Sequence, residues 1–237
     1  MLGQVDVDAK SNEITAIPKL LDMLDVKDAT ITTDAMGCQK EIVKKIREKQ
    51  AHYVLALKGN QGHCHEEISL FLRTLEHEKV KGNYRYEQTI DGEHGRIETR
   101  EYWTSDRLNW FEGKSEWKDL TTATMVKSTR EINGETSVEY RYYISDHALS
   151  ESEKTTRAIR SHWQVENCLH WSLDVSFNED RWRSKLGNCA ANIGLINKIA
   201  LNLLKAEKSV KNGIKTKRLM AGWDENYLMK VLGIAQI

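Results

Sequence analysis

The sequence predicts an α/β protein: a βαβ unit, then a β-rich insertion, then C-terminal helices. In the βαβ unit, a short β-branched strand ends at Asp34 and residues 39–50 form an amphipathic helix. The apolar run HYVLAL (52–57) is typical of a buried parallel strand. Between residues 83 and 145, two segments rich in β-formers surround Asp-Gly and Asn-Gly, dipeptides that favour hairpins. Helical spacing then returns and continues towards the C-terminus.

The length of 237 residues suffices for one sizeable core with a smaller appended part. We divide the chain into an N-terminal part of the core (1–82), the β-rich insertion (83–150), and a C-terminal helical part of the core with a basic tail (151–237). The formal net charge is zero, so a nucleic-acid partner must be met by local basic patches. The single proline predicts mostly regular structure.

Several classes are excluded by composition. No window approaches eighteen consecutive apolar residues, so we expect no membrane span and no membrane partner. The start, MLGQVDVDAK, has neither the basic nor the apolar region of a signal peptide. The cysteines show no CxxC spacing, so they indicate reduced thiols in a cytoplasmic protein and neither disulfides nor a zinc site. These are Cys38, Cys64, Cys168 and Cys189.

A carboxylate interrupts the apolar stripe of the segment RSHWQVENCLHWSLDV (160–175). At helical spacing, Ile159, His162, Glu166, Leu169 and Leu173 share one face. A carboxylate on a core-facing stripe costs several kcal/mol unless a cation, hydrogen bonds or a proton compensates it. A bound metal ion would compensate Glu166 and would require further carboxylates from elsewhere in the chain. The alternative is that the helix turns Glu166 towards an arginine or water.

Asp34 lies where such a second carboxylate is expected. It ends the first strand of the βαβ unit, and ligands of open α/β sheets bind at the carboxyl ends of the strands. A helix N-cap aspartate occupies the same kind of position, so the alternative role is structural. After the second strand, KGNQ offers Lys58, Asn60 and Gln61 at the same sheet edge, where they would contact a phosphate backbone.

Basic residues of the C-terminal part are the other candidates for DNA contact. They occur in NEDRWRSK and in the stretch 205–218, and they would neutralise phosphates and release counterions. The alternative is a solvated helix surface. The candidates are Arg181, Arg183, Lys185, Lys211, Lys215, Lys217 and Arg218.

Within the β-rich insertion, His94, Arg96, Glu98 and Arg100 alternate along one strand and are expected to form a polar face. An exposed sheet face stabilised by cross-strand charge pairs explains the same pattern equally well.

These motifs resemble a known family. The chain is similar to bacterial insertion-sequence transposases and, more narrowly, to the H-repeat-associated group. The segments that carry the resemblance are TITTDAMGCQ, YVLALKGNQ, the β-rich insertion and RSHWQVENCLHWSLDVSFNEDRWR. The likeness runs nearly end to end and includes KRLMAGWDENYLMKVL; HWQVENCLHW around Glu166 is its most specific part. The resemblance implies an RNase H-like core with a DDE triad, of which Asp34 and Glu166 match two carboxylates.

The resemblance also implies chemistry and partners. Such carboxylates hold two Mg²⁺ (or Mn²⁺) ions roughly 3.5–4 Å apart, and the ions cleave and join phosphodiesters by in-line displacement. The expected partners are DNA, namely insertion-sequence ends and target, and a second copy of the chain. In the family, the first aspartate of the triad lies on a strand upstream of the segment that resembles GQVDVDAK. The carboxylates of Asp6 and Asp8 are poor substitutes.

The expectation is therefore an RNase H-like core without its first strand and an impaired or inactive DDE transposase. The alternatives are a DNA-binding remnant without catalysis and a degenerate product without activity.

Overall fold

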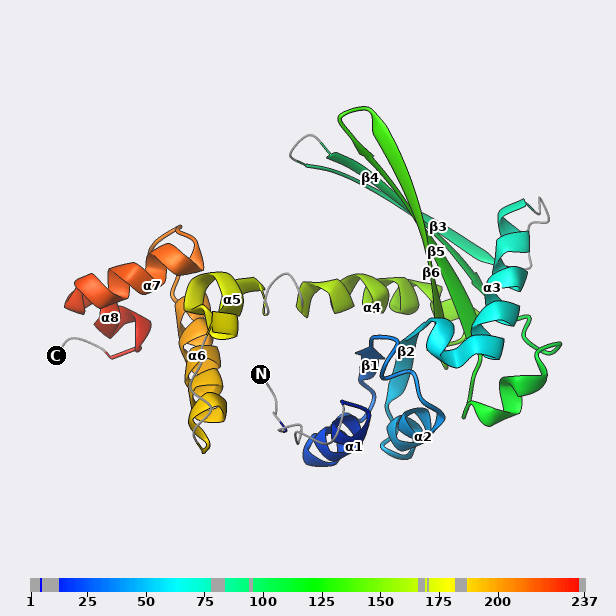
Figure 1. Cartoon of the computed structure of the whole chain (residues 1–237), viewed down its shortest axis with the longest axis horizontal. Coiled ribbons are helices and arrows are strands. Elements are labelled where there is room, and N and C mark those ends of the chain that lie inside the picture. The colour runs from blue at the N-terminus through cyan, green and yellow to red at the C-terminus, as the bar shows by residue number, and fades with distance from the viewer. Residues whose placement is uncertain are drawn as a thin grey trace. The chain divides into compact units, whose positions relative to one another are not determined.

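The computed structural model describes residues 5, 13–77, 84–93, 96–165, 169, 171–181 and 187–234. The chain forms two compact units, residues 2–162 and residues 163–237. The first unit contains a six-stranded sheet in the order β1-β2-β6-β5-β4-β3, with helices on both faces (Figure 1). The second unit is helical in its described part. This architecture confirms the predicted α/β fold class and is consistent with an RNase H-like core.

The predicted βαβ unit is confirmed. It consists of β1 (Thr30–Thr33), α2 (Lys40–Glu48) and β2 (His52–Leu57). The two strands pair in parallel, so their carboxyl ends lie at the same edge of the sheet. The helix forms because its apolar residues recur three and four positions apart, and it buries Ile42, Val43 and Ile46. β2 is buried on both faces, as its apolar run predicts.

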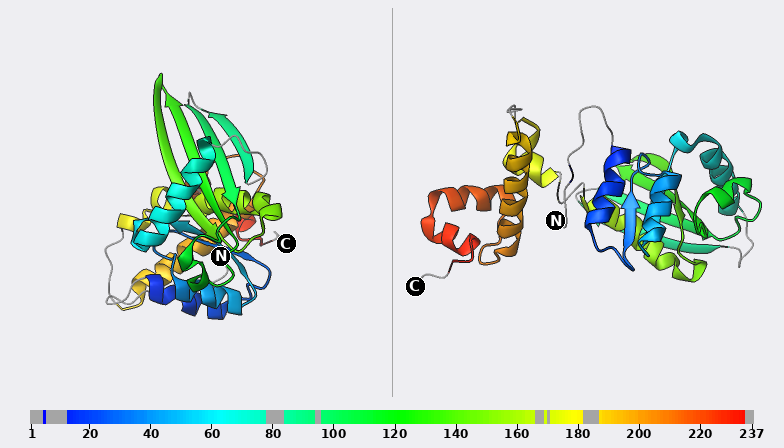
Figure 2. Two further views of the ribbon diagram at one scale, coloured as in Figure 1. Left: turned by 90° about the vertical axis from the view of Figure 1, so that its right-hand side faces the viewer. Right: turned by 90° about the horizontal axis from the view of Figure 1, so that it is seen from below.

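Helices cover both faces of the sheet (Figure 2). α1 (Glu13–Met23), α2 and α3 (Gly62–His77) pack on one face, where the larger hydrophobic core lies. α4 (Ser152–Val165) packs on the other face through Ile159. The partners of Ile159 in this smaller cluster are the sheet residues Val54, Tyr102, Val126 and Tyr143.

The predicted β-rich insertion is confirmed as four antiparallel strands. They are β3 (Arg85–Glu93), β4 (Arg96–Ser105), β5 (Thr122–Ile132) and β6 (Glu135–Ser145). β6 joins the insertion to the core by pairing with β2 from Ser145 to Tyr142. The remaining parts of these strands project from the core as an arm, which we define as residues 87–93, 96–102, 126–132 and 135–141 (Figure 1).

The two hairpin signals have different outcomes. Asn133 and Gly134 connect β5 to β6 with φ angles of 53° and 83°, the positive values that make Asn-Gly a favoured hairpin turn. Asp91 and Gly92 were expected to form a turn, but they lie inside β3 and pair with β4. The pairing continues to Glu93 opposite Arg96, so the turn predicted at Asp91-Gly92 is wrong.

Short 3-10 helices occupy the connections. In the first unit these are η1 (Gly59–Gln61), η2 (Glu112–Glu116) and η3 (Leu149–Glu151). In the second unit, η5 (Glu179–Arg181) follows α5 (Trp171–Phe177). None of the described helices combines the length and the apolar character needed to cross a membrane.

The remaining helices of the second unit are α6 (Cys189–Ala206), α7 (Ile214–Trp223) and α8 (Glu225–Val231). A buried polar network joins them. The ammonium of Lys217 donates to the carbonyl of Glu207 at 2.5 Å and to that of Leu204 at 3.3 Å. The hydroxyl of Tyr227 donates to Glu207 Oε2 at 2.8 Å. Lys217 therefore satisfies carbonyls at the end of α6 that the helix itself leaves unpaired.

This network predicts acid sensitivity of the second unit. Hydrogen bonds from Ser209 and Tyr227 and the nearby Lys217 hold the pKa of Glu207 at about 2, below its ordinary 4.5. Because the pKa is lower in the folded state, Glu207 stabilises the fold above pH 4.5, and this contribution is lost as the pH falls towards 2. We expect the thermal midpoint, followed by circular dichroism, to fall over this range more for the wild type than for Glu207→Gln. Equal falls would contradict the assignment.

Candidate functional site

Asp34 directly follows β1 and lies at the carboxyl ends of the parallel strands. Its Oδ1 accepts hydrogen bonds from the backbone N–H groups of Met36 at 3.1 Å and Gly37 at 3.2 Å. The next helix begins only at Lys40, with Gln39 as its N-cap. Asp34 therefore shapes the turn after β1 and does not cap α2. The side chain is exposed, and Oδ2 makes no hydrogen bond or ion pair within the described residues.

The KGNQ loop supports this turn. Lys58 follows β2 and is exposed. The side-chain amide of Asn60 donates to the carbonyl of Ala35 at 2.6 Å, and that of Gln61 donates to the carbonyl of Cys38 at 2.8 Å. Both amides thus bind the loop that begins at Asp34. They fix its position from the neighbouring strand end.

Gly37 permits a close approach inside the same turn. A Cβ atom at this position would lie 2.6 Å from Thr33 Cβ and 3.1 Å from Ile17 Cδ1. Contacts below 3 Å require a neighbour to shift, and Thr33 Cβ is fixed to the strand backbone. The turn that orients the Asp34 carboxylate therefore depends on glycine at position 37.

We expect Gly37→Ala to lower the free energy of unfolding by about 1–3 kcal/mol, as overpacking of a filled site does. Gly59→Ala is the matched control, because an added Cβ there meets no atom within 4 Å. Urea unfolding curves of both variants measure the effect. Equal stability of the two variants would show that the turn relaxes without strain.

α4 reaches β1 close to Asp34. The ring of His162, in the last turn of α4, has its Nδ1 3.1 Å from the hydroxyl of Thr32. Thr32 precedes Asp34 by two residues, and His162 precedes Glu166 by four. Glu166, the second predicted carboxylate, lies outside the described residues. α4 ends at Val165.

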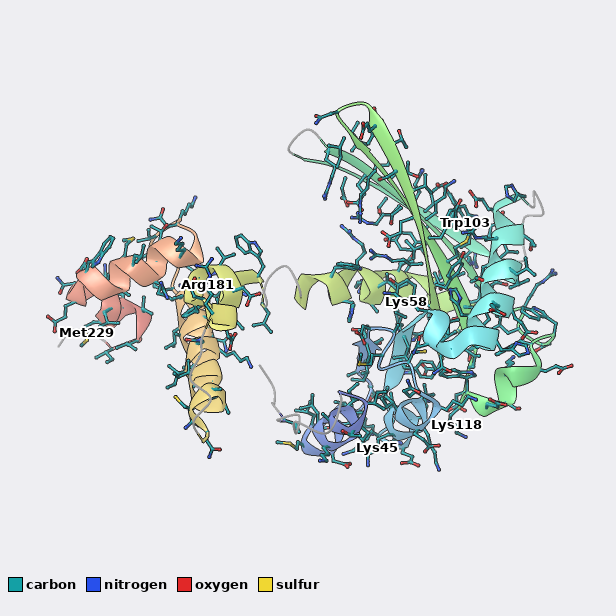
Figure 3. The ribbon with its side chains drawn as sticks, viewed as in Figure 1. Lys45, Lys58, Trp103, Lys118, Arg181 and Met229 are labelled. Carbon is teal, nitrogen blue, oxygen red and sulfur yellow. The ribbon has the colours of Figure 1, made fainter. Side chains whose placement is uncertain are left out.

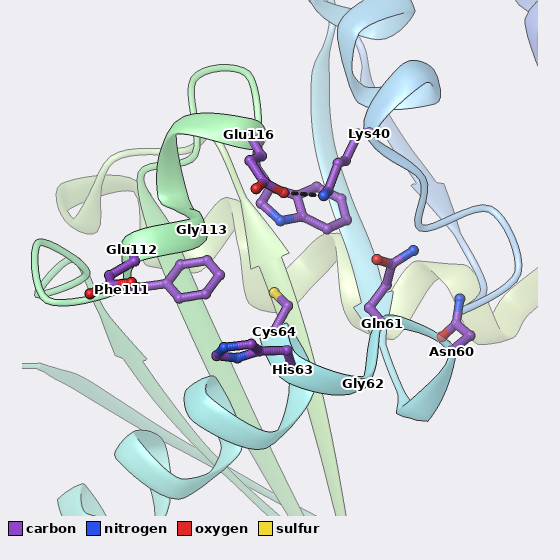
Figure 4. Close-up of a pocket in the computed structure, with 11 residues that line it drawn as sticks. Lys40, Asn60, Gln61, Gly62, His63, Cys64, Phe111, Glu112, Gly113 and Glu116 are labelled. Atoms are coloured by element: carbon purple, nitrogen blue, oxygen red, sulfur yellow. Dashed lines mark hydrogen bonds and ion pairs between the residues drawn. The ribbon is translucent and has the colours of Figure 1, made fainter.

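A pocket of about 540 Å³ lies beside the KGNQ loop, lined by the first residues of α2 and α3 and by η2 (Figure 4). Lys40 and Glu116 form an ion pair on one side of it. Cys64 lines the pocket, and burial raises the pKa of its thiol to about 12. The thiol is therefore protonated at neutral pH and is no nucleophile. Asp34 does not line this pocket.

Among the described residues, one group of metal-ligating types comes together: His52, Asp146 and His147 offer ligand atoms within 4.8 Å of one another. His52 begins β2, and Asp146 follows the end of the antiparallel β6. Asp34 follows the end of β1, which runs parallel to β2. The group therefore lies at the sheet edge opposite Asp34, and it is not the predicted carboxylate site.

The hydrogen bonds of Asp146 define the role of this group. Its Oδ1 accepts from the backbone N–H of Tyr53 at 2.7 Å. Its Oδ2 accepts from the Arg47 guanidinium at 2.6 Å and lies 2.7 Å from His52 Nδ1. Burial lowers the pKa of His147 below its ordinary 6.5, so this ring is neutral at pH 7. Because a guanidinium already neutralises the carboxylate, we assign Asp146 a structural role in tying β6 to β2.

The basic residues of the second unit differ in accessibility. Lys211 and Lys215 are exposed, as is Arg181 on η5. The Arg218 guanidinium lies 5.5 Å from the centre of the Phe177 ring. Lys217 is only 6% exposed, with its ammonium directed at backbone carbonyls. Arg183 and Lys185 lie outside the described residues. Figure 3 labels Lys58 in the first unit and Arg181 in the second.

Comparisons with known proteins identify the family of this chain. Residues 1–203 match the protein family described as "Transposase DDE domain". The chain belongs to this family of DDE transposases. It is 44% identical over 236 residues to "Putative transposase YncI" of Escherichia coli O157:H7, covering 98% of this chain and 60% of that protein.

A second relative carries the name of the H-repeat-associated group, which the sequence motifs resemble. The chain is 42% identical over 239 residues to "H repeat-associated putative transposase YhhI" of Escherichia coli K12, covering 98% of this chain and 62% of that protein. The chain thus spans about three fifths of the length of these curated relatives. The predicted family resemblance is confirmed.

Sequence reasoning on this transposase-family chain missed two features of the first unit. It did not identify the contact between His162 and Thr32, which joins segments 130 positions apart. It also missed the group around Asp146, whose members come from two strand ends. Periodicity gives no signal for either feature, because both depend on the pairing of distant segments.

Proposed function

We propose that this chain acts on DNA phosphodiesters as a DDE transposase, with Asp34 and Glu166 as two carboxylates of its metal site. The observation that carries the proposal is the exposed Asp34 carboxylate at the carboxyl end of a parallel strand, in a family-matched sequence. The contact between His162 and Thr32 brings the last turn of α4 to β1 near Asp34. Glu166 stays a prediction from the sequence.

The residues around Asp34 would have different roles in this site. Met36 and Gly37 hold Oδ1 through their N–H groups, and Oδ2, which has no partner among the described residues, would be available for coordination. Carboxylate oxygens are the ligands that Mg²⁺ and Mn²⁺ favour, so the donor type fits these ions. When bound, two such ions supply an activated water or 3′-hydroxyl and stabilise the leaving oxygen. Asn60 and Gln61 keep the turn fixed through the carbonyls of Ala35 and Cys38.

The substrates in this proposal are the ends of an insertion sequence and the target DNA. Exposed or half-exposed cations would contact the phosphates: Lys58, Arg181, Lys211, Lys215 and Arg218. Arg183 and Lys185 lie outside the described residues, so their contact with DNA stays a prediction from the sequence. We leave Lys217 out of this set because its ammonium is buried against carbonyls.

A second candidate function is DNA binding without cleavage. It is favoured by the exposed cations Lys58, Lys211 and Lys215, which would bind phosphates whether or not a metal site forms. Asp6 and Asp8, the nearest alternatives in sequence, lie outside the described residues. In this case catalysis would be impaired while the basic surfaces still bind duplex DNA.

A strand-cleavage assay separates the two functions. Supercoiled plasmid and a labelled duplex are incubated with the chain and Mg²⁺ or Mn²⁺, with EDTA as the control. Cleavage that needs the metal ion supports the DDE transposase. Salt-sensitive binding of the same duplex with no metal-dependent cleavage supports the second candidate. If the chain shows no binding and no cleavage, both candidate functions are contradicted.

A further inference from the structure

Basic side chains occupy one face of the arm. Successive residues of a strand point to opposite faces, and Tyr102, Val126 and Tyr143 face α4. Counting in steps of two along β4 and β5 places Arg96, Glu98, Arg100 and Arg130 on the face that carries α4. We call this surface the arginine face. Its cations are Lys58, Arg96, Arg100, Arg130, Arg141 and Arg160.

A buried carboxylate orders the centre of the arginine face. Glu98 is 1% exposed, although it lies on the arm. Its Oε2 is 2.5 Å from Arg100 Nη2 and 3.2 Å from Arg96 Nη2, and its Oε1 accepts from Arg130 Nε at 3.0 Å. Three guanidinium groups thus enclose one carboxylate. Their planes are held in fixed positions, which reduces the side-chain entropy lost when they bind an anion.

Further ion pairs extend this network across the face. Asp91 on β3 accepts from Arg100 at 2.5 Å and from Arg160 of α4 at 2.9 Å. Glu139 on β6 pairs with Arg141 at 2.8 Å. Five guanidinium groups therefore share three carboxylates in these ion pairs. The register also places Lys58, Glu87, Glu93 and Glu135 on this face, so its six cations and six carboxylates balance in formal charge. The ion pairs order the arginines, and within them the guanidinium groups outnumber the carboxylates, so N–H donors are left over.

The outer guanidinium groups retain donors for a ligand. The side chain of Arg96 is 53% exposed and that of Arg130 is 36% exposed. Each guanidinium has five N–H donors in a planar fork, and Arg96 uses one nitrogen for Glu98. Planar forks with spare donors match the oxygens of phosphate groups.

The arginine face begins at the sheet edge that holds Asp34. β2 ends at Leu57 opposite Tyr142, so Lys58 and Arg141 follow as the next position of the antiparallel pair. The pKa of Glu139 is lowered mainly by the hydrogen bond and charge of Arg141, and further by the charges of Arg130 and Lys58. Thr32 faces α4 through His162, and two residues further along lies Asp34. The arm then continues beyond this edge through residues 135–141 (Figure 1).

We propose that the arginine face binds the phosphate backbone of the DNA duplex that flanks the reacting phosphodiester at Asp34. The proposal rests on the proposed function, since it names the surface that carries the substrate of that site. The length of the face suits a duplex: Arg96 and Arg100 are four residues apart, roughly 14 Å along a strand. Such contacts read no base sequence, so we expect binding that depends on salt and little on sequence.

The test uses the double variant Arg96→Gln and Arg130→Gln. These two side chains are the more exposed partners of Glu98, and Arg100 remains to pair with it. The matched control is Lys44→Gln with Lys118→Gln, which removes the same charge from exposed sites outside the arm. Fluorescence anisotropy in EDTA measures the affinity of each protein for a random-sequence duplex between 50 and 200 mM salt, conditions under which electrostatic binding changes steeply.

We expect the arginine variant to lose more than about tenfold in affinity at the lower salt concentration. Its slope of log K against log salt should fall by about 1.8, or about 0.9 for each lost phosphate contact. The lysine control should keep the wild-type slope. Arg160→Gln, which removes the pair with Asp91, should lower the slope by about half as much. Thermal unfolding by circular dichroism identifies variants that fold.

Equal slopes for the wild type and both arginine variants would overturn the proposal and show that the charges serve only as cross-strand pairs. Failure of the wild type to bind duplex would also overturn it. Because binding is measured without metal ions, this result is independent of cleavage. Binding that depends on the arginines, in a protein that does not cleave DNA, would support the arginine face and reject catalysis.

Discussion

Asp34→Asn is expected to reduce metal-dependent strand cleavage by more than about 100-fold. Residues that only orient metal ligands typically contribute 10–100-fold, so loss of a ligating carboxylate should have a larger effect. Asparagine keeps the shape of the side chain and an oxygen that accepts from Met36 and Gly37. The turn after β1 should therefore remain folded while the charge is lost. Cleavage rates of a labelled duplex in Mg²⁺ and Mn²⁺ provide the measurement.

The same variant has a second readout that needs no catalysis. In EDTA, the loss of one negative charge beside the DNA should leave duplex affinity unchanged or increase it. Asp25→Asn is the matched control, because Asp25 is exposed in the segment before β1, away from its carboxyl end. If Asp34→Asn cleaves DNA at the wild-type rate, or if Asp34→Asn and Asp25→Asn lose cleavage equally, Asp34 is not part of the metal site.

Asp146→Ala is expected to lower the free energy of unfolding by about 3 kcal/mol, the largest stability effect we predict. The side chain is 2% exposed and accepts from Tyr53 and Arg47. Removing one partner from a buried pair leaves the other charge uncompensated, and a buried N–H without an acceptor adds about 1–3 kcal/mol. Arg47 also donates to the carbonyl of Ala51, which keeps the loss below the upper limit for a fully buried pair.

Asp119 provides the matched control for Asp146. It also accepts from Arg47, at 3.0 Å, but its side chain is 43% exposed. Exposed ion pairs contribute about 0–1 kcal/mol, so Asp119→Asn should have little effect. Asparagine removes the charge and tolerates the positive φ angle of 57° at this position. Urea unfolding of the two variants measures the difference. If both lose the same free energy, the group at this edge of the sheet does not depend on the buried carboxylate.

Local patterns in the sequence were sufficient to predict the βαβ unit and the β-rich insertion. The apolar run of β2 and the spacing of Ile42, Val43 and Ile46 report burial directly. The position of Asp34 at a strand end followed from the same pattern. By contrast, Asp91-Gly92 was misread as a turn, because the pairing of Glu93 with Arg96 outweighs the local preference of the dipeptide.

Contacts between distant segments could not be predicted in this way. The polar face of Arg96, Glu98 and Arg100 was expected, but Arg130 joins it through the register of β4 with β5. Lys217 looked like part of a basic surface, and only the packing of α7 against α6 directs its ammonium to carbonyls. Burial of a charged side chain depends on which backbone groups lie nearby, and a one-dimensional pattern does not contain that information.

The alternation of the arm restricts how its length can change during evolution. Arg130 on β5 lies before the Asn133–Gly134 turn, and the two strands pair from Ile132 with Glu135 back to the core. Two residues added to each strand at this turn would lengthen the arm and leave the cations facing α4. One residue added to β5 between Val126 and Arg130 would rotate Arg130 to the opposite face and separate it from Glu98. Relatives that differ in length between the core and Arg130 are therefore expected to differ there by even numbers of residues per strand.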